Sequence, residues 1–423
     1  MNRIAFFFVI ATLFFLIDLY VYQAVRVVTR DMSGGAQRAV TLIYWGFTGL
    51  ALLIYIVMQL LLPDAIGRSA RTMIWASVLI LYFGKFFTVI VLLVGDLGRL
   101  VAWVVSRFSS PDGQPATDEV TRIATDAIPR SEFLAKAALV AGAVPLVGFT
   151  YGILSGAHDY RVRRVKLALK NLPSGFNGMT IAQISDVHSG SFFNKTAVRG
   201  GVDLLLKQRP DIVFFTGDLV NSTADEVEDY IDVFNKIKAP LGVYSTLGNH
   251  DYGTYAQWPS AAAKQQNLND LIAAHKLLGW KLMMDEHKIL EQNGDKLALI
   301  GVQNLGFGPA ALRMGNLAKA YRGTEDYPAK LLLSHDPTHW DAEVRPKYSD
   351  IDVMFAGHTH GAQVGVDIGG VKWSPAQYFY KQWAGLYEEG NQRLYVNRGY
   401  GYIGYPGRIG ILPEITIFEL VQG

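Results

Sequence analysis

Four long apolar stretches occupy much of the first 156 residues of the chain. They are Ile4–Tyr22, Val40–Leu62, Met73–Val94 and Phe133–Leu154. Each is close to the roughly 20 residues that a helix needs to cross a bilayer, and each is apolar on every face rather than along one stripe. Helices of this kind are rare in soluble bundles, so the pattern predicts four membrane-spanning helices. Because no small-residue cleavage site follows the first stretch, we expect it to be an anchor and not a cleaved signal peptide.

The pattern changes at about Met179, where short apolar runs of strand length alternate with runs of helical periodicity. The expected strands are Met179–Ile184, Asp211–Thr216, Gly242–Thr246, Lys330–Leu333 and Asp352–Phe355, and the expected helices are Asn194–Gln208, Ala224–Ile237 and Ala261–Leu278. This alternation is typical of an α/β domain. The sequence therefore predicts a transmembrane helical region over 1–156 and an α/β domain over 157–423. A loop is predicted over Ser109–Pro129, between the third and fourth spans.

Charge follows the same division. Residues 1–156 hold 12 of the 39 Lys and Arg residues and 9 of the 37 Asp and Glu residues. The two signs nearly cancel over the whole chain and no long basic run is present, so charge does not indicate nucleic acid as a partner. The chain has no cysteine, which excludes disulfides, thiolate zinc sites, iron–sulfur clusters and cysteine nucleophiles. Any metal ion must therefore be held by His, Asp, Glu or Asn.

Polar residues gather directly after the predicted strands. Asp186 and His188 follow the first strand, Asp218 the second, Asn249, His250 and Asp251 the third, His335 the fourth, and His358 and His360 the fifth. Because the carboxyl ends of strands border the ligand crevice of an open α/β sheet, we expect these side chains to meet. Carboxylates, an amide and imidazoles without a thiolate suit a pair of divalent ions such as Mn, Fe, Zn or Co. A carboxylate such as Asp218 can bridge two ions roughly 3.5–4 Å apart.

These residues carry a resemblance to a known family. In chain order they resemble the five motifs of the calcineurin-like metallophosphoesterases, here of a membrane-anchored bacterial type: Asp186-x-His188, Gly217-Asp218, Gly248-Asn249-His250-Asp251, His335 and Gly357-His358-x-His360. The resemblance covers about 179–423 and implies a four-layer α/β/β/α sandwich. The strands expected in its second sheet are Leu297–Gly301, Leu394–Asn397 and Glu414–Leu420.

The resemblance also implies roles for the motif residues. Asp186, His188 and His360 would bind one metal ion, Asn249, His335 and His358 the other, and Asp218 both. His250 would not be a ligand but would stabilise or protonate the leaving oxygen. The reaction implied is hydrolysis of a phosphate ester or pyrophosphate bond by metal-activated hydroxide. An alternative function is a membrane receptor or scaffold that binds a phosphorylated ligand without cleaving it.

Two arginines near the C-terminus complete the predicted site. Arg398 and Arg408 lie in a stretch rich in Gly and Tyr, and they are predicted to grip a substrate phosphate because guanidinium binds phosphate oxygens bidentately. The alternative for each is an ordinary surface arginine that binds no substrate. Outside the motifs, His275, His287 and His339 are expected at the surface, with a place next to the site as the alternative for His339. No role is assigned to these three or to His158, which follows the last span.

The predicted membrane anchor also indicates a class of substrate. A membrane anchor raises the effective concentration of membrane substrates, so we expect a phosphorylated lipid or another envelope component. A cluster of aromatic residues suits a lipid interface, with core packing as the alternative: Trp373, Tyr378, Phe379, Tyr380, Trp383 and Tyr387. The stretch Arg130–Lys136 and the apolar run after it resemble a degenerate twin-arginine export signal that lacks the paired arginine. This similarity favours a catalytic domain outside the cytoplasm.

Overall fold

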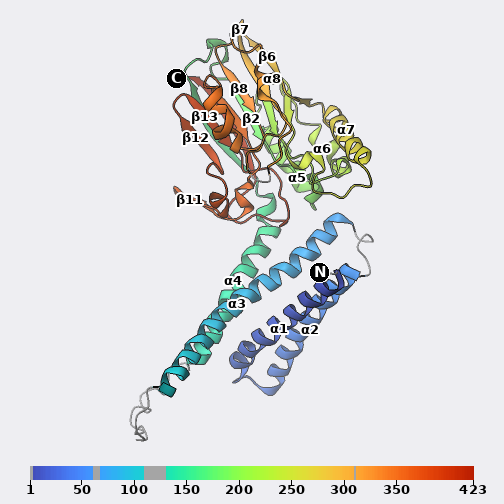
Figure 1. Ribbon diagram of the computed structural model, residues 1–423, viewed down its shortest axis with the longest axis vertical. Coiled ribbons are helices and arrows are strands. Elements are labelled where there is room, and N and C mark those ends of the chain that lie inside the picture. Colours follow the sequence, from blue (N-terminus) through green and yellow to red (C-terminus); the bar gives the residue numbers. More distant parts are fainter. Residues whose placement is uncertain (1–2, 61–66, 109–129, 309–310) are drawn as a thin grey trace. The chain divides into compact units, whose positions relative to one another are not determined.

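A computed structural model describes residues 3–60, 67–108, 130–308 and 311–423 (Figure 1). The chain forms two compact units that divide between Thr150 and Tyr151, within the fourth helix. The predicted domain boundary after residue 156 stays a prediction. The predicted loop Ser109–Pro129 lies outside the described residues.

Within the described residues, the N-terminal unit consists of four long helices. They are α1 (Arg3–Thr29), α2 (Gly34–Leu60), α3 (Arg68–Phe108) and α4 (Arg130–Leu154). All four are long and apolar enough to span a membrane. Large apolar side chains such as Leu42, Leu79 and Val147 are more than half exposed, as side chains that face lipid tails must be. The predicted four-helix transmembrane region is confirmed.

A buried charge pair connects three of these helices. Asp18 of α1 is fully buried and forms an ion pair with Lys85 of α3. The Asp18 carboxylate also accepts hydrogen bonds from Thr48 (2.9 Å) and Tyr44 (3.1 Å) of α2 and from Tyr82 (2.8 Å) of α3. Because each charge is neutralised by its partner, this geometry supports a packing role for the pair.

We expect Lys85→Met to destabilise the helical unit, because it leaves the buried Asp18 carboxylate without its cationic partner. Removing one partner of a buried ion pair typically costs about 3–5 kcal/mol of unfolding free energy. The midpoint of thermal unfolding of the full chain in detergent should fall, and the double variant Asp18→Asn/Lys85→Met should recover part of the loss. An unchanged midpoint in Lys85→Met would show that the pair does not stabilise the helices.

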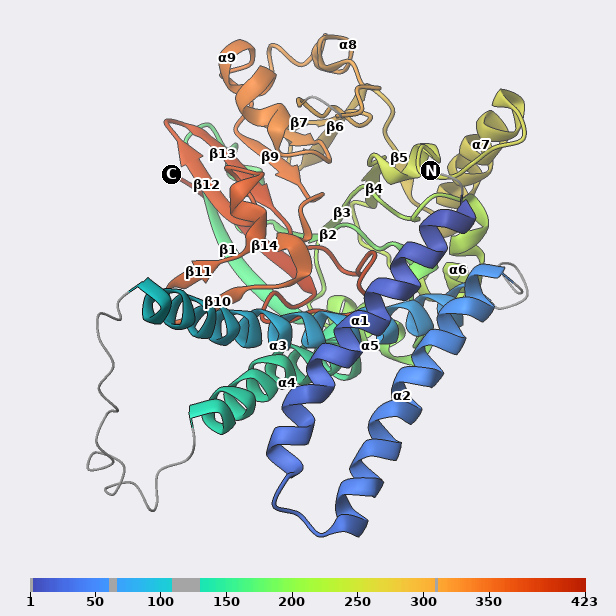
Figure 2. The same ribbon diagram turned by 60° about the horizontal axis from the view of Figure 1, so that its bottom comes forward.

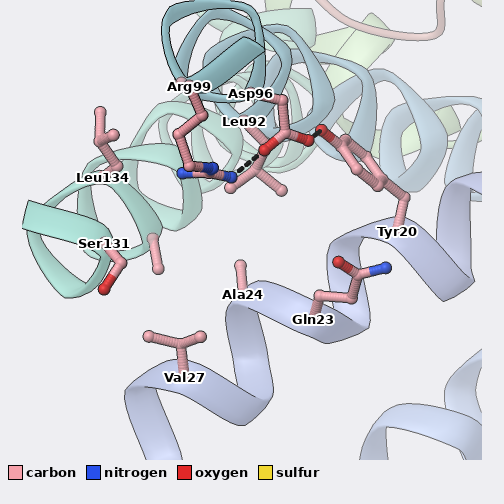
Figure 3. Close-up of a pocket in the computed structure, with 11 residues that line it drawn as sticks. Tyr20, Gln23, Ala24, Val27, Leu92, Asp96, Arg99, Ser131 and Leu134 are labelled. Carbon is pink, nitrogen blue, oxygen red and sulfur yellow. Dashed lines mark hydrogen bonds and ion pairs between the residues drawn. The ribbon is translucent and has the colours of Figure 1, made fainter. Parts of the chain in front are cut away.

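A second polar group lies in a cavity of about 220 Å³ lined by α1, α3 and α4 (Figure 3). Asp96 of α3 accepts hydrogen bonds from Tyr20 of α1 and from Arg99 of α3. Ala24 and Leu134 contribute apolar walls. The lining residues come from the C-terminal parts of α1 and α3 and from the N-terminal part of α4. The cavity therefore lies at one end of the helical unit.

The C-terminal unit is built on two six-stranded sheets (Figures 1 and 2). The order in the first sheet is β1 (Arg161–Leu169), β14 (Glu414–Gln422), β2 (Thr180–Ile184), β3 (Ile212–Thr216), β4 (Val243–Thr246) and β5 (Lys281–Leu282). The order in the second sheet is β12 (Gly385–Glu389), β13 (Gln392–Val396), β9 (Val353–Ala356), β8 (Lys330–Leu333), β7 (Asp295–Gly301) and β6 (Glu286–Gln292). The strands from β2 to β5 run parallel, as do β13, β9, β8 and β7, so within each group the carboxyl ends lie at one edge.

Apolar residues from the two sheets pack against each other and form the central core. The rings of Phe214 in β3 and Phe355 in β9 lie 5.2 Å apart between their centroids. The outer face of the first sheet is covered by α5 (Lys195–Leu206), α6 (Ile231–Phe234) and α7 (Ala261–Leu278). The outer face of the second sheet is covered by α8 (Leu317–Tyr321) and by a π-helical turn, Trp340–Val344, that leads into α9 (Arg345–Lys347) (Figure 2). The predicted four-layer α/β/β/α sandwich is confirmed.

Several local predictions are wrong. The C-terminal strand is expected in the second sheet, but β14 pairs between β1 and β2 in the first. His275 and His339 are expected at the surface but are fully buried. Each ring makes a hydrogen bond to a serine hydroxyl, Ser245 for His275 (3.0 Å) and Ser334 for His339 (2.9 Å). Burial lowers the pKa of His275 to about 3, and a neutral imidazole with such a partner is tolerated in a core.

Candidate metal centre

Five residues that follow the strands have left-handed backbone conformations. The φ angle is 52° at Asp186, 48° at His188, 60° at Asp218, 74° at His358 and 50° at His360. Residues other than glycine rarely adopt such angles, which cost of order 1–3 kcal/mol each and cluster at functional sites. These residues follow β2 and β3 of the first sheet and β9 of the second. The strained backbone therefore points to the carboxyl ends of both sheets as the functional site.

Asp186, His188 and His360 form one cluster of ligand atoms, and all three residues are buried. A carboxylate oxygen of Asp186 lies 3.3 Å from Nε2 of His360, and Nε2 of His188 lies 3.0 Å from the same nitrogen. One ligand atom from each residue lies within 4.8 Å of the other two. This spacing suits a single cation held by all three side chains.

Asp218, His335 and His358 form a second cluster. Atom Oδ2 of Asp218 lies 3.1 Å from Nε2 of His335, which in turn lies 3.2 Å from Nδ1 of His358. The same carboxylate oxygen lies 3.6 Å from Nε2 of His188 in the first cluster. Asp218 therefore stands between the two clusters, where a bridging carboxylate would have to be.

Asn249 and His250 follow β4 and differ in their hydrogen bonding, and of the two Asn249 has a buried, unpaired atom that suits a metal ion. The amide nitrogen of Asn249 donates to Tyr255 (3.0 Å), whereas its Oδ1 atom is buried and has no hydrogen-bond partner among the described residues. An unpaired buried oxygen is costly, so this atom fits a ligand for a cation. The ring of His250 instead donates from Nδ1 to the carbonyl of Asn221 (2.7 Å), and its backbone N–H donates to Asp218 (2.9 Å).

Contacts around the clusters hold the ligands in place. Nδ1 of His335 donates to the carbonyl of Thr216 (2.7 Å), which leaves Nε2 as the atom that faces the site. Asp251 accepts hydrogen bonds from backbone N–H groups that include those of Asp218 (2.9 Å) and Gly248 (2.9 Å), so it ties the end of β3 to the end of β4. A Cβ atom at Gly248 would collide with the Asp218 carboxylate, so glycine is needed there.

Burial controls the charges of the site. It lowers the pKa of His188 to about 3 and also lowers the pKa values of His358 and His360, so these imidazoles are neutral near pH 7, as metal ligands must be. Burial lowers the pKa of His335 as well, but the Asp218 carboxylate outweighs it and raises the pKa to about 10. His335 would therefore have to release its proton when it binds a metal ion. Burial also disfavours the charged form of Asp218, yet His335 holds the pKa of that carboxyl well below its usual range. Asp218 is therefore ionised and attracts cations.

The two arginines predicted to grip a substrate phosphate are both buried. Arg398 forms ion pairs with Glu414 (2.5 Å) and Asp367 (2.9 Å). Arg408 donates to backbone carbonyls, including that of Arg398 (2.8 Å), and a nitrogen of its guanidinium group lies 3.1 Å from Nδ1 of His360. Both guanidinium groups are engaged inside the protein, so this geometry does not support the predicted phosphate contact. Arg408 instead contacts a ligand of the first cluster.

Comparison with known proteins agrees with this arrangement. Residues 179–362 match the calcineurin-like phosphoesterase family, and residues 2–157 match the family described as "Probable Calcineurin-like phosphoesterase, transmembrane domain". The chain belongs to the calcineurin-like metallophosphoesterases. Proteins of this family typically bind divalent metal ions, and the two Asp/His clusters are groups that could hold them. The family resemblance predicted from the motifs is confirmed.

Relatives of this metallophosphoesterase occur in bacteria and animals. The chain is 28% identical over 288 residues to the metallophosphoesterase YkuE of Bacillus subtilis, an alignment that covers 67% of this chain and 93% of the relative. It is 27% identical over 315 residues to a "Transmembrane protein with metallophosphoesterase domain" of Danio rerio, and this alignment covers 71% of this chain and 66% of the relative. It is 25% identical over 243 residues to the phosphodiesterase YaeI of Escherichia coli, and this alignment covers 56% of this chain and 80% of the relative. The transmembrane family match and the transmembrane relative support association of this chain with a membrane.

Two tyrosines contact the metallophosphoesterase centre without being part of any motif. The ring of Tyr255 lies 4.4 Å from that of His250, and the hydroxyl of Tyr380 lies 2.9 Å from Nε2 of His358. No role is predicted for Tyr255, and Tyr380 is predicted either at a lipid interface or in the core. Both come from loops that reach the site only in the folded protein, so no local sequence signal identifies them.

Proposed function

We propose that the protein is a membrane-anchored phosphoesterase that uses two divalent metal ions to hydrolyse a phosphate ester or pyrophosphate bond. The observation that carries this proposal is the position of Asp218 between two clusters of ligand atoms. The residues that would hold one ion are Asp186, His188 and His360, those for the other are Asn249, His335 and His358, and Asp218 would contact both. When bound, such ions supply hydroxide near neutral pH and offset the negative charge of the phosphoryl oxygens. Mn, Fe, Zn and Co all suit this ligand set.

His250 provides the proton that the leaving oxygen needs. Its Nδ1 atom is committed to the carbonyl of Asn221, so a protonated His250 presents Nε2–H as its free donor. The backbone N–H of His250 is bonded to Asp218, which places the ring beside the proposed bridging ligand. A protein that only bound a phosphorylated ligand would have no need of a proton donor here. This arrangement therefore supports catalysis over the receptor or scaffold alternative.

Metal content and turnover together test the proposal. We expect the purified full chain to hold about two divalent ions, and to hydrolyse phosphate esters when loaded with Mn²⁺. A chelator should abolish phosphate release, and added metal should restore it. The substrates to compare are lipid phosphates, nucleotides and sugar phosphates; because positive and negative charges nearly balance, we do not expect nucleic acid among them. Binding of phosphorylated ligands by metal-loaded protein without hydrolysis of any of them would contradict the proposal and favour a receptor.

We also propose that the catalytic unit lies outside the cytoplasm. Four spans place the N-terminus and the catalytic unit on the same side of the membrane, and the export-like stretch Arg130–Lys136 supports the outer side. Protease added to intact spheroplasts should then remove the catalytic unit from the helices. Complete protection in spheroplasts, with cleavage after lysis, would place the unit in the cytoplasm.

A further inference from the structure

A small hairpin in the C-terminal unit has its apolar face turned outward. It consists of β10 (Val366–Ile368) and β11 (Val371–Trp373), which pair antiparallel with Val366 opposite Trp373 and Ile368 opposite Val371. Alternate residues of paired strands lie on one face, so these four apolar side chains share a face. Ile368 is 74% exposed and Val371 is 62% exposed. In a water-soluble hairpin such a face would be expected to pack against a core.

The polar face of the hairpin is fixed to the rest of the unit. Asp367 forms ion pairs with Arg163 of β1 (2.6 Å) and with Arg398 (2.9 Å). The ammonium group of Lys372 lies 4.7 Å from the ring centroid of Trp383, which is itself buried and therefore does not have the interfacial position expected of it. These contacts hold the polar face inward. The outward direction of the apolar face is thus a property of the fold.

Exposed aromatic side chains continue from the hairpin towards the metal centre. The indole nitrogen of Trp373 lies 3.5 Å from the hydroxyl of Tyr378. Tyr378 is 71% exposed, Phe379 is 81% exposed, and the next residue, Tyr380, contacts His358 of the second cluster. Consecutive aromatic residues therefore lead from the surface to a proposed metal ligand. We call the exposed set the apolar rim: Val366, Ile368, Val371, Trp373, Tyr378 and Phe379.

A cavity of about 340 Å³ adjoins both the rim and the metal centre. Its lining includes Asn249 and His358, which are proposed metal ligands, and Phe379, which belongs to the rim. Phe307 and Leu312 contribute further apolar walls. Asn304, Asp336 and Thr338 line the cavity as well. The cavity can therefore take the organic part of a substrate whose phosphate lies at the metals, and its apolar walls can contact an apolar group.

The fold also connects the rim to the last membrane-spanning helix. The backbone N–H of Arg408 donates to the carbonyl of Gly152 in the last turn of α4 (3.1 Å). The next residue, Ile409, forms a bridge with Val364 at the base of the hairpin. One loop thus contacts both the end of α4 and the hairpin. A hydrophobic surface on a unit that its own chain tethers to membrane-spanning helices fits a lipid surface as its partner better than a second protein.

We propose that the apolar rim contacts the bilayer and that the substrate is a phosphorylated lipid, whose phosphate enters the metal centre while part of its apolar alcohol occupies the cavity. This inference rests on the proposed hydrolase function and names its substrate class. In the reaction, the oxygen of a water molecule bonds to phosphorus and the bond between phosphorus and the lipid oxygen breaks. The proton from His250 goes to that oxygen. The products are a lipid alcohol and the corresponding phosphate.

Membrane contact can be tested by labelling, because the chain contains no cysteine and one introduced cysteine carries one label. The variant Ile368→Cys, bearing a polarity-sensitive fluorophore, is reconstituted as the full chain in phospholipid vesicles. The matched control is Leu277→Cys on α7, where the native side chain is 69% exposed. We expect blue-shifted emission and quenching by lipids with a quencher on the acyl chain at 368, and neither at 277. Equal exposure to water at both positions would overturn the proposal. So would a blue shift at 368 that increases with the amount of protein per vesicle and does not respond to the quencher lipid.

The substrate class is tested by a ratio of rates. Mn-loaded full chain in mixed micelles is given phosphatidate and phosphodiester phospholipids, and in parallel the soluble p-nitrophenyl phosphate and its diester. We expect Ile368→Asn/Val371→Asn to lower lipid hydrolysis relative to soluble-ester hydrolysis by about tenfold or more, whereas Leu277→Asn should leave the ratio unchanged. If soluble esters are cleaved and Ile368→Asn/Val371→Asn leaves the ratio of lipid to soluble-ester hydrolysis unchanged, the lipid inference is wrong but the hydrolase function stands. Failure to cleave any ester with full metal content would instead contradict the hydrolase function itself.

Discussion

Replacement of Asp218 by Asn is expected to abolish phosphate-ester hydrolysis and to strip metal from both clusters. Asn keeps the shape of the side chain but removes the negative charge that faces His335 at 3.1 Å and His188 at 3.6 Å. Loss of a group that merely supports a ligand costs roughly 10- to 100-fold in metal affinity or activity, so loss of a ligand shared by two ions should cost more. No other single substitution should affect both ions so strongly.

Metal analysis and circular dichroism of the purified variant would check this expectation. The matched control is Asp270→Asn on α7, an exposed carboxylate whose oxygen only accepts a hydrogen bond from Gln266 (2.8 Å). The control should keep its metal, its fold and its activity. A folded Asp218→Asn variant with full metal content and undiminished hydrolysis would show that the two clusters do not share this carboxylate.

The helices and the site motifs can be predicted because their signals are local. Each membrane helix is a continuous apolar run, and each motif lies within a few residues of the strand that carries it. His188 and Asp218 show this well, since both come directly after a short buried strand and both take the left-handed turn that the site requires. Convergence of the motifs then follows from the parallel direction of the strands.

What the sequence does not predict depends on contacts between distant residues. Arg398 resembles a phosphate-binding residue in a Gly- and Tyr-rich loop, and only the fold brings Glu414 and Asp367 to its guanidinium group. The alternation of Val366 and Ile368 around Asp367 is also ambiguous, because the same pattern describes a strand whose apolar face is buried. Ion pairs from Asp367 turn that face outward instead. Sheet membership of β14 is similarly set by pairing with β1 and β2, which no local pattern specifies.

His250→Ala should have a different signature from Asp218→Asn, because the ring is placed as a proton donor and not as a ligand. We expect metal content to be retained while turnover falls by roughly 100- to 10,000-fold, the range typical of a lost acid–base group. The hydrogen bond from Nδ1 to Asn221 (2.7 Å) fixes the ring, so removal of the imidazole should remove the donor without disturbing the clusters. Metal analysis with kinetics at saturating Mn²⁺ would measure both quantities.

Dependence on the leaving group separates proton donation by His250 from a general loss of structure. An alkyl phosphate needs a proton on its departing oxygen, whereas p-nitrophenolate leaves readily without one, so the defect of His250→Ala should be much smaller on the aryl ester. His287→Ala is a matched control, since that half-buried ring also donates from Nδ1 to a backbone carbonyl, that of Ala320 (3.0 Å), but lies on β6 outside the site. It should leave both rates unchanged. Loss of metal from His250→Ala would show that the residue is a ligand, and an equal defect on both esters would show that it does not supply the proton.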